Sequence, residues 1–146
     1  MLRIIKAFAF IALQFPSTVL AFDDAAIVKQ CNDEWGDDFA MVRYCREQQR
    51  KAGQAYDNFK DQAKTNETAS TILGHCESEW RKDYSMVVYC IEQQSSALQS
   101  LSAHADDVPS DIQEKIKSKC SVEWGIDFSM IAYCVQQQTK AWRSLQ

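Results

Sequence analysis

The chain has 146 residues and a net charge of −4, with 46% hydrophobic and 25% charged residues. This composition is that of an ordinary globular protein, and the negative charge disfavours nucleic acids and anionic membranes as general partners. No apolar run approaches the roughly 20 residues that a membrane-spanning helix needs.

The first 21 residues have the pattern of a secretory signal peptide. Arg3 and Lys6 form a basic start, residues 7–15 are apolar apart from Gln14, and small residues precede a cleavage point after Ala21. Residues 22–146 then form the exported protein, which we expect to be a single helical domain. Removal of the two basic residues takes its net charge from −4 to −6.

All six cysteines lie in the exported part of the chain. An even number of cysteines in a small exported protein indicates disulfide bonds formed in an oxidising compartment. Six cysteines taken alone allow 15 pairings.

One segment occurs three times. Each copy reads Cys-x3-Trp-x2-Asp-Phe/Tyr-x-Met-x2-Tyr-Cys-x2-Gln-Gln, and the copies begin at Cys31, Cys76 and Cys120. The offsets of 45 and 44 residues are typical of arrays built from helical hairpins. We expect the three repeats to cover about residues 24–62, 68–102 and 110–146.

Each repeat is predicted to fold as a helix, a tight turn and a second helix. Gly36 and Gly125 suit the end of the first helix, and Arg81 at the same place predicts a different turn in the middle repeat. Pro109 and Ser110, followed by Gln113, resemble a capping box. An aspartate suits the start of the second helix in each repeat. These aspartates are Asp38, Asp83 and Asp127.

The two cysteines of each repeat fall on the facing stripes of its two antiparallel helices. This placement favours one disulfide within each repeat. The predicted bonds are Cys31–Cys45, Cys76–Cys90 and Cys120–Cys134. The predicted fold class is therefore all-α, with three tandem disulfide-stapled helical hairpins forming a short array.

The helical stripe that carries Met41 and Cys45 also carries Gln48. A buried amide must be hydrogen-bonded, so this position predicts a structural glutamine that bonds to the facing helix. The three predicted buried glutamines are Gln48, Gln93 and Gln137.

Two alternatives assign chemistry to the repeated residues. Soft sulfur ligands such as Met41 and Cys45, four residues apart, suit copper(I), although an oxidising compartment opposes free thiolates. Paired carboxylates such as Glu34 and Asp38 could act in acid–base catalysis. Three equal copies are unusual for an active site, so we expect no catalytic residue, no bound metal and no cofactor.

The outward face of the second helix differs between repeats. Val88 and Ile91 in the second repeat, and Ala132 and Val135 in the third, are predicted to pack between neighbouring repeats. The first repeat instead carries a basic cluster, which is the predicted docking place for an acidic partner. The cluster consists of Arg43, Arg46, Arg50 and Lys51.

The repeated segment resembles an element of small exported bacterial proteins of unassigned function. The resemblance covers about half of each repeat and implies a helical hairpin in the bacterial periplasm. We expect a non-catalytic module that binds or scaffolds a protein or envelope component, in an oligomeric state that the sequence leaves open. A copper-handling protein and a small periplasmic enzyme are the alternatives.

Overall fold

The structure is a computed structural model that describes residues 22–146. These residues form six helices and no strand, which confirms the predicted all-α fold class. The helices are α1 (Asp24–Trp35), α2 (Phe39–Ala63), α3 (Glu67–Trp80), α4 (Tyr84–Ser102), α5 (Ser110–Trp124) and α6 (Phe128–Arg143). Within this part of the chain, every helix is too short or too polar to cross a membrane. The predicted signal peptide lies outside the described residues.

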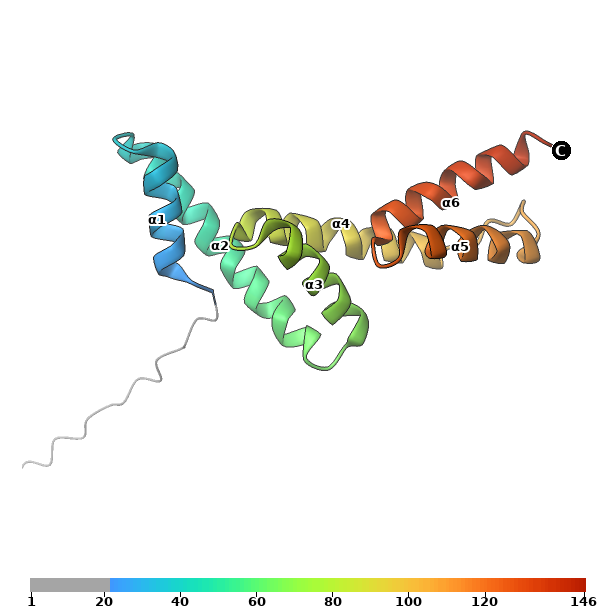
Figure 1. Cartoon of the computed structure of the whole chain (residues 1–146), viewed down its shortest axis with the longest axis horizontal. Coiled ribbons are helices and arrows are strands. Elements are labelled where there is room, and N and C mark those ends of the chain that lie inside the picture. The colour runs from blue at the N-terminus through green and yellow to red at the C-terminus, as the bar shows by residue number, and fades with distance from the viewer. Residues whose placement is uncertain (1–21) are drawn as a thin grey trace, which may run out of the picture.

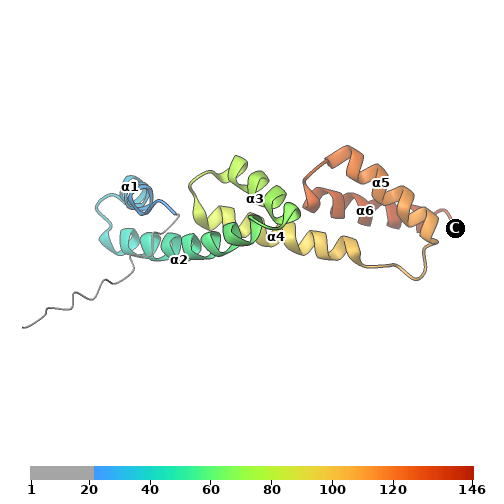
Figure 2. The same ribbon diagram turned by 90° about the horizontal axis from the view of Figure 1, so that it is seen from below.

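Consecutive helices pair into three hairpins that follow one another along the long axis of the molecule (Figures 1 and 2). One disulfide closes each hairpin, and the paired Cα atoms are 5.7 Å apart in all three. The bonds are the predicted ones, Cys31–Cys45, Cys76–Cys90 and Cys120–Cys134. Closure of a loop of this length stabilises a chain by about 3 kcal/mol in the chain-entropy model. The disulfides therefore offset the small core of each hairpin.

The turns of the three hairpins share one backbone conformation. The φ angle is 52° at Gly36, 51° at Arg81 and 59° at Gly125. The different turn predicted at Arg81 is therefore wrong, because arginine adopts the same positive-φ conformation there, with a ψ of −108°, at a cost of about 1–3 kcal/mol. Each turn leads into a second helix whose N-cap aspartate accepts a hydrogen bond from a methionine amide 3.1–3.2 Å away. These pairs are Asp38–Met41, Asp83–Met86 and Asp127–Met130.

The larger of two hydrophobic clusters joins hairpins 1 and 2. Ile27 and Val87 are fully buried in it. Tyr84 lies at the start of α4 and packs its ring against Phe22 and Tyr56 of hairpin 1, with ring centroids 5.9 and 5.2 Å apart. The first turn of α4 is therefore held by residues of the preceding hairpin.

The second cluster lies in hairpin 3 and includes residues of α4. Ile116 of α5 and Ile131 of α6 are buried in it, and Leu101 of α4 packs against them. Phe128 contacts both clusters, so it links the core of hairpin 3 to the rest of the array.

The second helices of neighbouring hairpins pack against one another, α2 with α4 and α4 with α6. We call the turn of a hairpin together with the first turn of its second helix the hairpin tip; the tips are residues 36–41, 81–86 and 125–130. The tip of hairpin 1 and the C-terminus lie at opposite ends of the molecule (Figure 1).

The tip of each following hairpin is held by a glutamine of the preceding one, and we call this contact the joint. Gln49 of α2 donates a hydrogen bond to the carboxylate of Asp83 at 2.8 Å and accepts one from the backbone N–H of Ser85 at 3.3 Å. Gln94 of α4 makes the same two bonds to Asp127 and Ser129, at 2.9 and 3.3 Å. The joint is therefore a specific polar clamp that occurs twice.

The prediction of which glutamines are buried was wrong by one residue. Gln49 and Gln94 are buried, whereas the predicted ones are exposed. The exposed glutamines are Gln48, Gln93 and Gln137. The physical reason is that the next hairpin packs on the side of the helix that faces Gln49 and Gln94, about 100° around the axis from the predicted position.

The outward apolar residues of hairpins 2 and 3 agree with their predicted place between repeats. Ile91 is buried in the first cluster and Val88 packs against it. Val135 packs against the second cluster, and Ala132 is half-buried.

The segment between α4 and α5 is closed by Gln113, which does not form the predicted capping box. Its side chain is buried and bonds to the backbone N–H of Ala105 and to the carbonyls of Ala105 and Val108 at 2.8–3.2 Å. The N-cap of α5 is Pro109, which supplies no side-chain acceptor. The glutamine therefore stabilises the loop instead of the helix end.

Candidate binding surface

Four side chains are identical in all three repeats and remain exposed. We call them the repeated surface. It consists of Glu34, Trp35, Tyr44 and Gln48 in hairpin 1, Glu79, Trp80, Tyr89 and Gln93 in hairpin 2, and Glu123, Trp124, Tyr133 and Gln137 in hairpin 3. The tryptophans are 38–40% exposed and the tyrosines 55–57%. Since the core does not require these residues, their retention in three copies points to a role at the surface.

The aromatic residues come from the facing ends of the two helices of a hairpin. Trp35 is the last residue of α1, and Tyr44 lies in the second turn of α2, next to the disulfide cysteine. The disulfide and the tight turn fix these two helix ends relative to each other. The repeated surface is therefore held rigidly without being packed into the core.

A hollow of about 230 Å³ lies where the repeated surface of hairpin 1 meets the tip of hairpin 2. Trp35, Tyr44 and Gln48 line one side of it, and Asp83 and Met86 line the other. Pockets for small-molecule ligands are typically about 300–1,000 Å³. The hollow therefore suits a single side chain or similar small group of a larger ligand.

Five of the six repeated carboxylates have structural partners. The repeated aspartates, Asp38, Asp83 and Asp127, are the N-caps of the second helices. Glu79 lies 3.8 Å from the ring of His75, and Glu123 lies 3.1 Å from the ammonium of Lys119. Both pairs are four residues apart on a helix, which is the common spacing of a surface ion pair. In this arrangement these carboxyl groups serve as helix caps or surface ion pairs, and no two of them stand out as a general acid and a general base.

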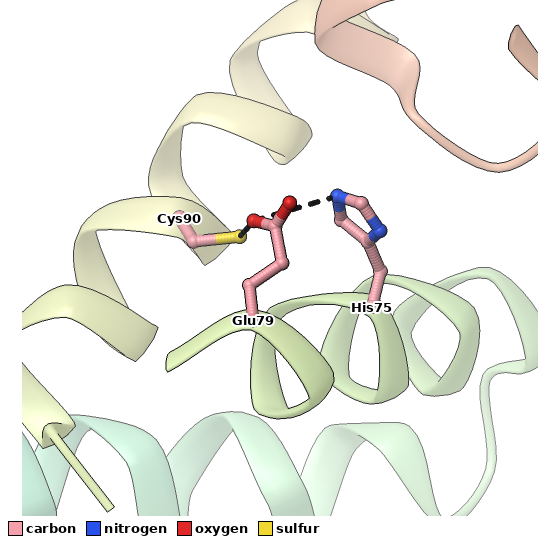
Figure 3. A group of neighbouring side chains, drawn as sticks. All are labelled: His75, Glu79 and Cys90. Carbon is pink, nitrogen blue, oxygen red and sulfur yellow. Dashed lines mark hydrogen bonds and ion pairs between the residues drawn. The ribbon is translucent and has the colours of Figure 1, made fainter. Parts of the chain in front are cut away.

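His75, Glu79 and Cys90 bring their ligand atoms within 4.8 Å of one another (Figure 3). Cys90, however, is bonded to Cys76, and a disulfide sulfur lacks the thiolate that binds metal. Hairpin 3 has Lys119 at the position of His75, where it forms an ion pair with Glu123. The donor set therefore does not fit a metal ion while the disulfide is intact.

The same limit applies to the predicted copper ligands. Each methionine of the repeat has its cysteine neighbour four residues away, and all three of these cysteines are in disulfides. Copper(I) binding at Met41 and Cys45 would require the bond to Cys31 to be reduced first.

The basic cluster predicted as a docking place is largely paired within hairpin 1. Arg50 donates two hydrogen bonds to Asp24, at 2.6 and 3.0 Å, which lowers the pKa of that carboxyl. Arg46 bonds to the side chain of Asn32 at 2.8 Å, and Arg43 lies 3.9 Å from a glutamate one turn away. Lys51 is exposed. The cluster thus carries less free positive charge than the sequence indicates.

Neither the repeated surface nor the joint glutamines were predicted from the sequence. The first glutamine of each pair was expected to be buried, whereas the second one is buried in hairpins 1 and 2. The available signal was the strict identity of Glu-Trp, Tyr and Gln-Gln in three repeats whose other surface residues vary.

Comparison with protein-family models, curated proteins and solved structures finds no match for this chain.

Proposed function

We propose that the protein is a non-catalytic exported module that binds or scaffolds a protein or envelope component through the repeated surface. The observation that carries this proposal is the presence of exposed Glu, Trp, Tyr and Gln at matching places in three hairpins. Tryptophan and tyrosine are enriched among the residues that dominate binding energy at interfaces, because they bury a large area with few rotatable bonds.

Three equal surfaces on one rigid array suit a ligand that is itself repetitive or that is held at several points. A single shallow surface binds weakly, whereas linked surfaces act at high effective concentration on the same ligand. The hollow at hairpin 1 would take one side chain or small group of the ligand, and the array would set the spacing between the three surfaces.

The compartment we propose is the bacterial periplasm. Three disulfides support an oxidising environment, and the resemblance of the repeated segment to elements of exported bacterial proteins favours the periplasm among such environments. An acidic partner docking near Arg43, Arg46 and Lys51 remains part of the proposal, with Arg50 contributing less because it is ion-paired with Asp24.

The test uses the full-length gene expressed with export in a bacterial host. The variant Tyr44→Ala with Tyr89→Ala and Tyr133→Ala removes exposed rings and should leave the fold intact. We expect the wild-type protein to form saturable cross-links to one envelope component, and we expect the triple variant to lose them.

A matched control replaces two exposed residues outside the repeated surface, Gln54→Ala and Gln99→Ala, and should cross-link like the wild type. Circular dichroism and thiol counting verify that all three proteins are folded and oxidised. Equal cross-linking by the triple tyrosine variant and the wild type would refute a binding role for the repeated surface.

A further inference from the structure

The joint has two halves, and each end of the array presents one half without its counterpart. One half is a helix face with a glutamine, and the other half is a hairpin tip with an N-cap aspartate and an aromatic residue. Hairpins 2 and 3 insert their tips into the helix faces of α2 and α4. The tip of hairpin 1 and the matching face of α6 have no such counterpart in residues 22–146.

The exposed half-joint at the start of the array is the tip of hairpin 1. Phe39 is 77% exposed, whereas its counterpart Tyr84 is 6% exposed and Phe128 is half-buried. Asp38 is also exposed, although the two equivalent aspartates each accept a bond from a glutamine of the preceding hairpin. Hairpin 1 therefore presents an apolar ring and an N-cap carboxylate at the positions that form the internal joints.

The exposed half-joint at the other end lies on α6 and the turn after it. Gln138 occupies the position of Gln49 and Gln94 in the repeat alignment. Leu145 occupies the position of Tyr56, which contacts the ring of Tyr84 in the first joint. Leu145 is 82% exposed, as expected for a joint residue that lacks its aromatic partner.

We propose that the tip of hairpin 1 of one molecule docks onto the α6 face of a second molecule and forms a third joint. In this joint the side chain of Gln138 donates to the carboxylate of Asp38 and accepts from the backbone N–H of Ala40. The ring of Phe39 covers Leu145. The partner is thus a second copy of this chain, recognised by the contact that the chain already makes twice within itself.

The geometry makes this contact head-to-tail. The two half-joints lie at opposite ends of an elongated molecule (Figure 1), so one molecule cannot use both on the same neighbour. A repeated head-to-tail contact that does not close on itself produces an open chain of molecules. The repeated surface would then continue along that chain with the spacing it has within one molecule.

The intermolecular joint is weaker than the internal ones. Arg43 and Arg46 stand where Val88 and Ile91 pack in hairpin 2, so part of the apolar contact is missing. No linker raises the local concentration of the two halves, as it does within the chain. The association should therefore depend on protein concentration. It does not rest on the proposed role of the repeated surface, although that surface borders the joint at the hollow of about 230 Å³.

The test is sedimentation velocity of the full chain, expressed with export, over a range of concentrations. The wild type should form oligomers of increasing size. Phe39→Glu blocks the tip of hairpin 1, and Leu145→Glu blocks the α6 face. Both residues are exposed, so neither change should disturb the fold.

Each variant alone should be monomeric. An equimolar mixture should form dimers and nothing larger, because the intact tip of the Leu145→Glu variant can dock only onto the intact α6 face of the Phe39→Glu variant, and the other two half-joints are blocked.

A matched pair of variants tests the polar clamp. Gln138→Ala should weaken association about 30-fold, the effect expected for losing both hydrogen bonds of the clamp, and Gln136→Ala, at an exposed position outside the repeated surface, should leave it unchanged. A wild type that stays monomeric at about 1 mM would overturn the proposal. So would a single blocked variant that still dimerises, which indicates a symmetric contact, or a mixture of the two variants that stays monomeric.

Discussion

Replacing Gln94 by alanine should uncouple hairpin 3 from the rest of the array. The side chain is 5% exposed and makes both bonds of the second joint, to Asp127 at 2.9 Å and from the backbone N–H of Ser129 at 3.3 Å. Nothing else about the local helix changes, because alanine is the best helix former. The variant therefore reports on the joint.

The magnitude follows from the two lost bonds. A hydrogen bond to a charged group contributes about 1.5–3 kcal/mol, and one between neutral groups about 0.5–1.5 kcal/mol. Asp127 keeps its bond to the amide of Met130, and both partners are partly exposed, so water replaces some of what is lost. We expect a loss of about 2 kcal/mol in the coupling of hairpin 3, which corresponds to roughly 30-fold more frequent opening.

Native-state amide hydrogen exchange measures this effect at each helix. Exchange in α5 and α6 should accelerate in Gln94→Ala, whereas α1 and α2 should keep their wild-type rates because the first joint is intact. The converse variant, Gln49→Ala, should accelerate exchange in α1. Gln93→Ala removes the exposed neighbour of Gln94 and serves as the matched control. It should change the opening free energy of hairpin 3 by less than about 0.5 kcal/mol.

Two outcomes would refute this reasoning. Exchange rates in Gln94→Ala that match those of Gln93→Ala would mean that the joint contributes no coupling. Uniform acceleration over all six helices would mean that the array unfolds as one unit and that its stability is not divided between hairpins and joints.

Two further predictions follow from the helix interiors and from the surface ion pairs. Gly74→Ala should raise the free energy of unfolding by up to about 1 kcal/mol in urea denaturation, because a Cβ there meets no atom within 4 Å. Gly53→Ala should not raise the free energy of unfolding, because its Cβ would lie 2.6 Å from the packed ring of Phe22. An equal rise in both variants would contradict this packing of Phe22 against α2. The bonds of Asp107 to Arg143 lower its pKa from the ordinary value of 3.8, as ion pairs do for Asp23 and Asp24. A carboxyl group whose pKa is lower in the folded state than in the unfolded state stabilises the protein at pH values above its unfolded-state pKa. The thermal unfolding midpoint should therefore be constant near neutral pH and fall below about pH 4. Asp107→Asn should make that fall smaller.

Features of the structure that depend on residues close together in the chain could be predicted from the repeat pattern. The threefold pattern predicted six helices, the three disulfides and the N-cap aspartates, and all of these are confirmed. Each feature involves residues at most fourteen positions apart, so helical periodicity and one pair of cysteines per repeat are sufficient to place it.

How one hairpin meets the next could not be predicted in this way, because it depends on packing between distant residues. Gln48 and Gln49 are neighbours in sequence but point about 100° apart on the helix, and which of them is buried depends on the direction from which hairpin 2 approaches. That direction is set by contacts between residues more than thirty positions apart, such as Gln49 with Asp83. The same non-local packing covers Tyr84 and leaves Phe39 in water, although the two occupy equivalent places in the repeat. A local pattern cannot distinguish equivalent positions whose surroundings differ only because, within residues 22–146, one hairpin follows another and hairpin 1 does not.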